Sequence, residues 1–341
     1  MQSAFPRWCV RTRLTTRLAL RILSVAFFWA LMPSAQSAPA PLVTASASVP
    51  RGPLLRERIT TESRLTSHNG RQYRIVVSVP KGPAPSGGFP VIYVLDADAW
   101  FGMAVEIARM REYEKLAPAV IVGIGSPRHF FFDVTRSFDF TPVGSSDPDF
   151  DGIELGGADE FIVFLAQSLK PWVASRYRVD RSRQTLFGHS LGGLFVLHVL
   201  LKAPDTFSVY LAASPSIRFS DRAIVKEAAT ITATPARRQV RVLVTVGGLE
   251  SHPSPQLVAD YRRFYTEHPE AIKGQTVAEA IDALFADDPT FDKAAETRGL
   301  VESLAHSGIK ATFAQFDGEE HLSAAISALN RGIPFALRPE P

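Results

Sequence analysis

Three nearly continuous apolar runs divide the chain between residues 91 and 246. They cover residues 91–95, 120–124 and 240–246 and are rich in β-branched side chains. Strands that are buried on both faces have this pattern, which is typical of a parallel sheet covered by helices. Over residues 158–177, apolar positions recur near the helical period. Strand and helix patterns in alternation predict an α/β fold.

Shorter strand-like stretches complete the expected sheet. Residues 55–66 and 72–79 predict two antiparallel strands, joined by a turn at Asn69-Gly70. The remaining strand-like segments cover residues 185–187, 207–212 and 311–316. We therefore expect a mostly parallel, twisted sheet of about eight strands with helices on both faces, formed by a single domain over residues 55–338.

Two segments depart from this alternation. Residues 130–157 form a long stretch rich in aromatic and acidic side chains, and residues 251–308 predict several helices with polar joints. Long segments of this kind inside a compact domain are often functional loops or lids. We expect both to be insertions near the site, with 251–308 as a helical insertion over it, and the sequence leaves open whether that insertion is a lid.

The N-terminal segment has the pattern of an export signal. Residues 1–37 contain five arginines and no acidic residue, and their apolar run, residues 22–32, is shorter than the about 20 residues that span a bilayer. Small residues before Ala38 predict cleavage there, and residues 38–54, rich in Pro, Ala and Ser, predict a flexible leader. We expect a periplasmic or secreted protein with no stable membrane insertion after cleavage.

Charge and cysteine content narrow the function classes. The chain has a formal charge of +3, from 37 basic and 34 acidic residues, but without the five N-terminal arginines 32 basic residues face the same 34 acids. The remaining chain therefore offers no basic footprint for nucleic acid. Cys9, the only cysteine, lies in the expected signal, which excludes disulfides, a cysteine nucleophile and cysteine-ligated metal from the mature chain. The sequence also lacks H-E-x-x-H and a Gly-rich phosphate loop, so we expect neither a metal nor a cofactor.

A nucleophile motif lies where a predicted strand meets a predicted helix. Residues 188–193 have the sequence GHSLGG, which matches G-x-S-x-G with Ser190 at its centre. The strand-like residues 185–187 precede it and a helical run over residues 194–202 follows. In this context the motif turns sharply and exposes the serine oxygen, as in the α/β-hydrolase fold. We predict that Ser190 is a nucleophile; the alternative is a Gly-rich turn with a solvated serine.

A serine hydroxyl needs a base to take its proton, and His321 has the expected position. In α/β-hydrolases the base follows the last strand, and the chain order is Ser, acid, His. His321 follows the strand-like residues 311–316, with a turn at Gly318. The other seven histidines fit less well; His189, beside the nucleophile, is expected to point elsewhere.

The acid of the expected triad has several candidates. Glu250 follows the strand-like residues 240–246 across two glycines, which is the usual place for this acid. Its rivals are Asp260, Asp317, Glu319 and Glu320. A Ser–His dyad without an acid also stays open.

Two turns would supply the backbone N–H groups of an oxyanion hole. One donor is the N–H of Leu191, directly after the nucleophile. The other comes from the turn after residues 91–95, where Ala97 or Asp98 would donate.

These motifs together resemble the "Putative esterase" family of α/β-hydrolases and, within it, the periplasmic siderophore esterases of the IroE type. The resemblance extends from about residue 55 to residue 338. It is carried by the segments VIYVLDAD (91–98), IVGIGSP (121–127), TRSFDFTP (135–142), GGADEFIVFLAQSLKPWVASRYRVD (156–180), LFGHSLGGLFVLHVLL (186–201), YLAASPSI (210–217), VTVGGLE (244–250) and FDGEEHLSA (316–324). Members of the family often have Gly where this chain has Ala97.

The resemblance implies hydrolysis of carboxylic ester bonds, with Ser190 and His321 in the family's nucleophile and base positions. It suggests a small-molecule ester substrate of the triscatecholate trilactone class, such as enterobactin, including ferric catecholate siderophores. Two alternatives remain: an esterase for feruloyl, acetyl or other small acyl esters, and a catalytically silent binding protein of the same fold.

Arg136 and Phe138 are the candidate substrate contacts. They lie in the long segment 130–157, which also contains Phe130, Phe131, Phe132 and Phe140. An arginine and aromatic rings would bind anionic catechol rings through charge and cation–π contacts. The alternative is that these phenylalanines form a small core under a long loop.

Overall fold

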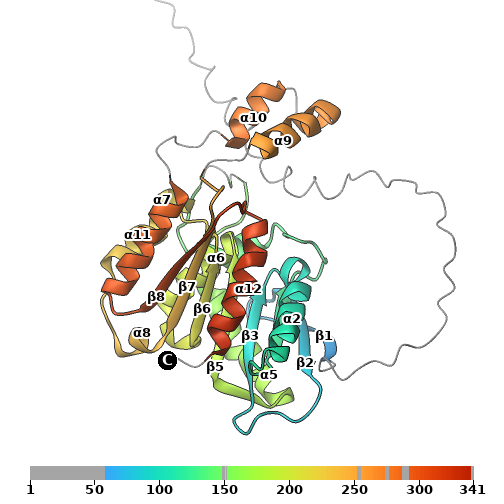
Figure 1. Cartoon of the computed structure of the whole chain (residues 1–341), viewed down its shortest axis with the longest axis vertical. Helices are drawn as coiled ribbons and strands as arrows, with labels where there is room; N and C mark the ends of the chain where they lie inside the picture. Colours follow the sequence, from blue (N-terminus) through green and yellow to red (C-terminus); the bar gives the residue numbers. More distant parts are fainter. Residues whose placement is uncertain are drawn as a thin grey trace, which may run out of the picture. The chain divides into compact units, whose positions relative to one another are not determined.

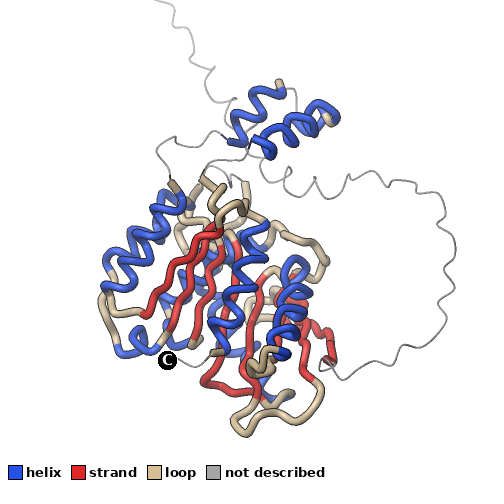
Figure 2. The backbone as a smooth tube through the Cα atoms, viewed as in Figure 1, coloured by secondary structure: helices blue, strands red, loops and turns tan. Residues whose placement is uncertain are grey.

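The computed structural model describes residues 58–147, 150, 152–251, 255–272, 276–285 and 292–338. The expected signal peptide and leader, residues 1–54, lie outside these ranges. The described chain contains an eight-stranded sheet with helices around it (Figure 1, Figure 2). The strands are β1 (Arg58–Thr66), β2 (Gln72–Pro80), β3 (Phe89–Leu95), β4 (Val120–Gly125), β5 (Val179–His189), β6 (Val209–Ala213), β7 (Arg241–Gly247) and β8 (Lys310–Phe316).

The strand order in the sheet is β1-β2-β4-β3-β5-β6-β7-β8. β1 with β2 and β2 with β4 pair antiparallel, and all further neighbours pair parallel. The predicted mostly parallel sheet of eight strands is therefore confirmed. β5 begins at Val179, earlier than the apolar pattern at 185–187 predicted. Its first five residues are partly or fully exposed and four of them are polar, so they gave no apolar signal.

The helices of the sheet-bearing unit lie on both of its faces. α2 (Ala97–Tyr113) and α12 (Ser323–Leu337) pack against each other, in front of the strands in Figure 1. α6 (Leu191–Lys202) leads from β5 to β6, whereas α2 leads from β3 to β4 in the opposite direction across the sheet. Right-handed crossovers therefore put α6 on the other face. There α11 (Lys293–His306) packs against β7 and β8.

The predicted helix over residues 158–177 forms as three continuous pieces: α4 (Ala158–Val163), the π-helix η2 (Phe164–Leu169) and α5 (Lys170–Arg176). The other helical segments of this unit are α3 (Arg136–Phe140), η3 (Pro204–Thr206), α7 (Phe219–Thr230) and α8 (Pro235–Gln239).

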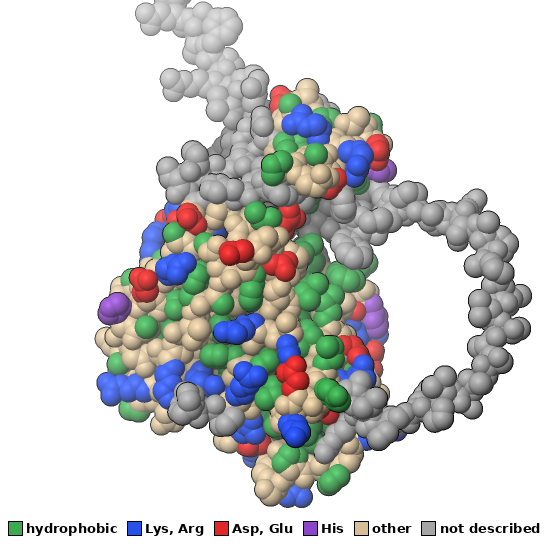
Figure 3. Space-filling view, viewed as in Figure 1, with side chains coloured by type: hydrophobic (Ala, Val, Ile, Leu, Met, Phe, Trp, Pro, Cys, Tyr) green, Lys and Arg blue, Asp and Glu red, His purple; other side chains and the backbone are tan. Residues whose placement is uncertain are grey.

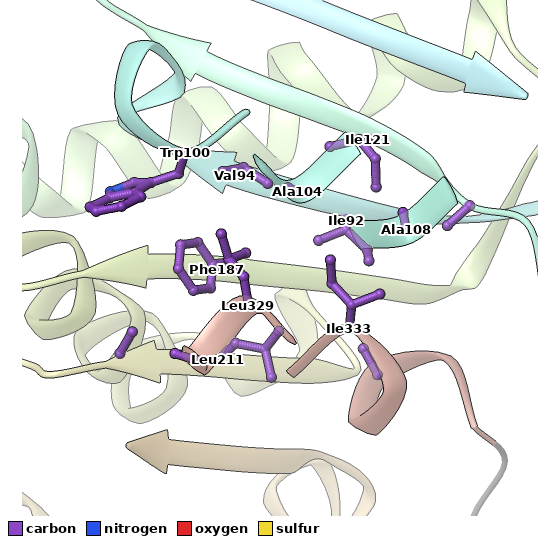
Figure 4. Close-up of a cluster of buried hydrophobic side chains, with 14 of the residues drawn as sticks. Ile92, Val94, Trp100, Ala104, Ala108, Ile121, Phe187, Leu211, Leu329 and Ile333 are labelled. Atoms are coloured by element: carbon purple, nitrogen blue, oxygen red, sulfur yellow. The ribbon is translucent and has the colours of Figure 1, made fainter. Parts of the chain in front are cut away.

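A hydrophobic core fills the space between the sheet and the α2–α12 pair. Ile92 and Val94 of β3 and Phe187 of β5 contribute to one buried cluster with Leu329 and Ile333 of α12 (Figure 4). All five side chains are fully buried. Alternate residues of β3 point to the opposite face and are equally buried, so both faces of this strand require apolar residues. This explains the continuous apolar runs in the sequence.

The described chain divides into two compact units. The larger unit contains the sheet and the helices named above. The smaller unit contains α9 (Pro255–Glu267), η4 (Pro269–Ile272) and α10 (Val277–Phe285), with an apolar cluster of its own around Tyr265 and Ile281. The insertion expected over 251–308 is therefore too long, because α11 belongs to the larger unit. Its expected place over the site stays a prediction.

One face of the described chain carries side chains of every type. Figure 3 shows acidic, basic and hydrophobic side chains interspersed on one face. Among the described helices, none combines the length and the apolar character that crossing a bilayer requires.

Candidate active site

Ser190 occupies a sharp turn between β5, which ends at His189, and α6, which begins at Leu191. Its backbone has φ 60° and ψ −118°, a strained conformation that typically costs about 1–3 kcal/mol in a residue with a side chain. The turn is close enough that a Cβ atom at Gly188 would lie 2.3 Å from the carbonyl oxygen of Gly192. Only glycine fits at position 188, which explains the first glycine of the motif.

Three predicted residues come together at the carboxyl edge of the sheet. His321 Nε2 lies 3.0 Å from Ser190 Oγ, and His321 Nδ1 lies 2.7 Å from Glu250 Oε2. Ser190 follows β5, Glu250 follows β7 and His321 follows β8, and parallel strands bring these three loops to one edge. With Nδ1–H donating to Glu250, Nε2 is left free to accept the proton of Ser190, which is the arrangement a serine nucleophile requires.

The carboxylate of Glu250 is buried and held by several donors. Ser214 Oγ donates to Oε1 over 2.6 Å, and the Gly247 N–H donates to the same oxygen over 2.5 Å. Lys293 Nζ lies 2.6 Å from Oε2. Burial would raise the pKa of Glu250, but the charge of Lys293 and the hydrogen bond from His321 lower it well below its usual range. Glu250 is therefore ionised when His321 acts as a base.

Three of the four rival acids have other side-chain partners. Asp317 accepts from Gln315 over 3.2 Å, and Glu319 accepts from Ser327 over 2.8 Å. Asp260 belongs to the smaller unit and pairs with Arg263 there. The His321 ring donates its hydrogen bond to Glu250, as the position of the Glu250 loop predicted.

The predicted oxyanion donors are N–H groups at the starts of two helices, which follow the neighbouring strands β3 and β5. Ala97 and Asp98 are the first residues of α2, and Leu191 is the first residue of α6. Helix-start N–H groups have no acceptor within their helix. Because β3 pairs with β5, with Val94 opposite Phe187, both helices begin at the same part of the sheet edge. The two turns are therefore neighbours, and the role of their N–H groups in an oxyanion hole stays a prediction.

Arg136 forms an ion pair with Asp96 and lines the neighbouring cavity, so its predicted contact with substrate stays a prediction. Its Nε and Nη2 each donate over 2.8 Å to the carboxylate of Asp96, and Nη2 lies 3.4 Å from the carbonyl oxygen of His189. Asp96 precedes α2 with φ 51°, in the left-handed region. Burial raises the pKa of Asp96, and the Arg136 guanidinium opposes that rise. Arg136 thus joins the turn before the oxyanion donors to the nucleophile turn.

A cavity of about 310 Å³ adjoins the Asp96–Arg136 pair. Its lining also includes Tyr73, Phe130 and Phe140. Phe138, the other predicted substrate contact, is absent from this lining: its ring packs 3.7 Å from the guanidinium carbon of Arg71. Phe140 is buried, whereas 61% of Phe130 is exposed, so the phenylalanines of this segment divide between a core and a surface position.

The sequence did not predict the positions of two further residues at the site. Lys293, at the start of α11, contacts Glu250 from a segment that was expected to be an insertion, and no motif marked it. His189 was expected to point elsewhere, but its Nε2–H donates to the carbonyl oxygen of His321 over 2.7 Å. Burial lowers the pKa of His189 well below its ordinary value, so it is a neutral support for the loop of the base. Its place inside the G-x-S-x-G motif was the available signal.

Known proteins are similar to this chain in sequence and in fold. Residues 66–334 match the model of the family described as "Putative esterase". Ferri-bacillibactin esterase BesA of Bacillus subtilis is 36% identical over 294 residues, which cover 82% of this chain and 90% of that protein.

Among solved structures, siderophore hydrolase EstA from Aspergillus nidulans is 29% identical with a TM-score of 0.64, covering 88% of this chain and 97% of its own. The enterobactin hydrolase IroE in complex with DFP has a TM-score of 0.62 and covers 83% and 96%, and at 22% identity it shows the shared fold alone. The family match over most of the chain and the identity to the Bacillus esterase agree with the fold and with the serine motif: the chain belongs to the "Putative esterase" family and has the α/β-hydrolase fold.

Proposed function

We propose that this chain hydrolyses carboxylic esters through an acyl-enzyme formed on Ser190. The hydrogen-bonded series Glu250–His321–Ser190, with 2.7 Å and 3.0 Å between its members, is the observation that carries the proposal. His321 takes the proton of Ser190 as the serine oxygen attacks the carbonyl carbon, and Glu250 stabilises the imidazolium. His321 then gives this proton to the leaving alcohol. A water molecule, deprotonated by the same base, releases the acid and restores Ser190.

The negative charge that develops on the carbonyl oxygen requires preorganised donors. In the proposed mechanism these are the N–H of Leu191 and an N–H from Ala97 or Asp98. The Asp96–Arg136 pair holds the second turn in place, because two hydrogen bonds fix the left-handed residue directly before it. Arg136 is thus a support for the proposed oxyanion site, and as a lining residue of the cavity it remains a candidate substrate contact.

We infer that the substrate is a siderophore ester, with triscatecholate trilactones as the favoured class. The names of the Bacillus and Aspergillus relatives support this class, since both act on siderophores. Phe130, which lines the cavity, and the next residue, Phe131, are 61% and 51% exposed and offer aromatic area to catechol rings. Nε and Nη2 of Arg136 are engaged by Asp96, so we assign ring recognition mainly to these aromatic side chains.

We further propose that the protein acts in the periplasm or outside the cell, on the strength of the signal-like residues 1–37. N-terminal sequencing of exported protein should find Ala38 as the first residue. Exported protein that still begins at Met1 would contradict cleavage.

The experiment for the substrate class compares four esters with the purified mature protein: ferric enterobactin, iron-free enterobactin, ethyl ferulate and p-nitrophenyl acetate. We expect at least one trilactone to have a kcat/KM about 100-fold above that of ethyl ferulate, because binding of the remote rings is converted into rate. Ser190→Ala is the control and should abolish every reaction. Ethyl ferulate or p-nitrophenyl acetate as the best substrate would favour the small-ester alternative, and tight trilactone binding without hydrolysis would favour a silent binding protein.

A further inference from the structure

Lys293 places a buried cation beside the triad. Its Nζ lies 2.6 Å from Glu250 Oε2, 3.3 Å from the carbonyl oxygen of Ser214 and 3.5 Å from His321 Nδ1. Only 11% of the lysine side chain is exposed, and only 2% of the Glu250 side chain. A long flexible side chain loses about 1.5–2 kcal/mol of rotamer entropy when it is fixed in this way, so the contacts must outweigh that cost.

The start of α11 fixes the backbone of Lys293. The Asp292 side chain caps the helix by accepting from the Ala295 N–H over 3.0 Å. The Lys293 N–H donates to Ser251 Oγ over 2.8 Å, and Ser251 Oγ donates to Asp292 over 3.2 Å. Ser251 directly follows Glu250 in the chain, so the cap of α11 and the loop of the acid are joined. The lysine therefore approaches Glu250 from a defined position.

Lys293 and His321 share one acceptor atom. Both contact Oε2 of Glu250, over 2.6 Å and 2.7 Å, whereas Ser214 and the Gly247 N–H occupy Oε1. With Nδ1–H directed at Oε2, His321 has no lone pair at Nδ1 for the lysine. The 3.5 Å approach of Nζ to Nδ1 is therefore a charge beside the ring and not a hydrogen bond.

We propose that Lys293 is a positioning residue of this triad, whose ammonium group neutralises Glu250 and opposes protonation of His321 in the resting enzyme. The proposal rests on the proposed function, because it assigns the residue a role in the same esterase site. A lone carboxylate beside a histidine favours the protonated ring, which cannot accept the proton of a serine. The lysine offsets that effect while leaving the hydrogen bond between Glu250 and His321 in place.

The charges that face His321 come from several elements. Glu250 follows β7, Lys293 begins α11, Arg136 begins α3, and the neutral His189 ends β5, with its ring centroid 4.5 Å from that of His321. Partial burial lowers the pKa of His321, the charges of Lys293 and Arg136 lower it further, and Glu250 opposes them. A lowered pKa keeps the ring neutral, and able to act as a base, as the pH falls.

The placement of Glu250 does not depend on the lysine. Two donors, Ser214 Oγ and the Gly247 N–H, hold its other oxygen at 2.6 Å and 2.5 Å. Replacing Lys293 by a neutral residue therefore changes the charge next to His321 more than it changes the geometry of the acid. This separates an electrostatic role from a purely structural one.

The test measures kcat/KM for p-nitrophenyl acetate from pH 4.5 to 9 in the wild type, K293M and K293R. In K293M the acidic limb should move up by about one pH unit, because an opposing charge within about 4–6 Å is removed. Activity should fall about tenfold at a pH well below the wild-type limb and stay within about threefold on the alkaline plateau. K293R keeps the charge and should keep the wild-type limb. If K293M does not fold, K293Q supplies the neutral side chain and retains a donor for Ser214.

An unchanged acidic limb in the neutral variant would overturn the proposal, and so would an equal loss of activity at every pH, which a merely structural role predicts. NMR titration of the His321 ring in Ser190→Ala and in Ser190→Ala/K293M gives a readout without catalysis. The ring should titrate at a higher pH in the double variant. This result would stand even if no trilactone were hydrolysed, so a wrong substrate class and a wrong role for Lys293 give different outcomes.

Discussion

Replacing Glu250 by Gln turns one of the two acceptor oxygens of the carboxylate into an NH₂ donor. The amide oxygen can still accept from Ser214 and the Gly247 N–H, as Oε1 does now. The NH₂ group would then take the place of Oε2 and face His321 Nδ1 and Lys293 Nζ, which lie 2.7 Å and 2.6 Å from it. His321 can accept from that amide only as the tautomer with its proton on Nε2, and this tautomer cannot take a proton from Ser190.

The expected loss in kcat is about 10³–10⁴-fold, the range for a triad acid converted to its amide, and corresponds to about 4–5.5 kcal/mol. The KM for a small ester should change little, because the charge matters only after His321 is protonated. Stability should also fall. Breaking a buried ion pair costs about 3–5 kcal/mol of folding free energy. For a large domain, each kcal/mol lost lowers Tm by about 2–4 °C.

The assay is steady-state hydrolysis of p-nitrophenyl acetate, with thermal unfolding followed by circular dichroism to show that the variant is folded at the assay temperature. Glu319→Gln is the matched control, since its carboxylate accepts from Ser327 and has no described hydrogen bond to the His321 ring. It should stay within about threefold of the wild type. A Glu250→Gln variant with nearly wild-type kcat would show that Glu250 is not the acid of a triad and would leave a Ser–His dyad.

Three further results are expected. Arg136→Met should lower kcat about 10–100-fold with little change in KM, because the turn that follows Asp96 loses its support. Equally large changes in kcat and in KM would contradict this role of Arg136. Leu329→Ala, in a fully buried position, should lower the free energy of unfolding in urea by about 2–5 kcal/mol and leave activity at 25 °C within twofold. The wild-type kcat/KM should fall with decreasing pH only below the ordinary pKa of histidine, because His321 has a lowered pKa; an acidic limb above pH 7 would exclude this.

The sheet was predictable because its central strands are buried on both faces. β3, β4 and β7 each required an unbroken apolar run, and such runs are visible in a single sequence. The polar start of β5 was missed, since its exposed residues give no apolar signal. α11 was assigned to an insertion because a helical pattern alone does not tell which sheet face a helix covers.

The site was predictable where the chemistry depends on local sequence. The turn at Ser190 needs glycine at 188 for steric reasons, and the order of base and acid follows from the strands that precede them. The roles of Arg136 and Lys293 were not predictable from local sequence. Arg136 pairs with Asp96 and Lys293 with Glu250, and each pair joins segments about 40 residues apart. Such pairings follow from the packing of α3 and α11 and leave no local motif.

We expect Ser190 to attack the ester carbonyl of a siderophore lactone. Rapid-quench intact mass spectrometry of the wild-type protein during turnover of iron-free enterobactin tests it most directly. Attack on a ring ester opens the ring without releasing a fragment, so the acyl-enzyme should be heavier than the free protein by the full mass of the trilactone, with the adduct mapped to Ser190. Hydrolysis of the trilactone without such an adduct, or with the adduct on another residue, would show that Ser190 is not the nucleophile.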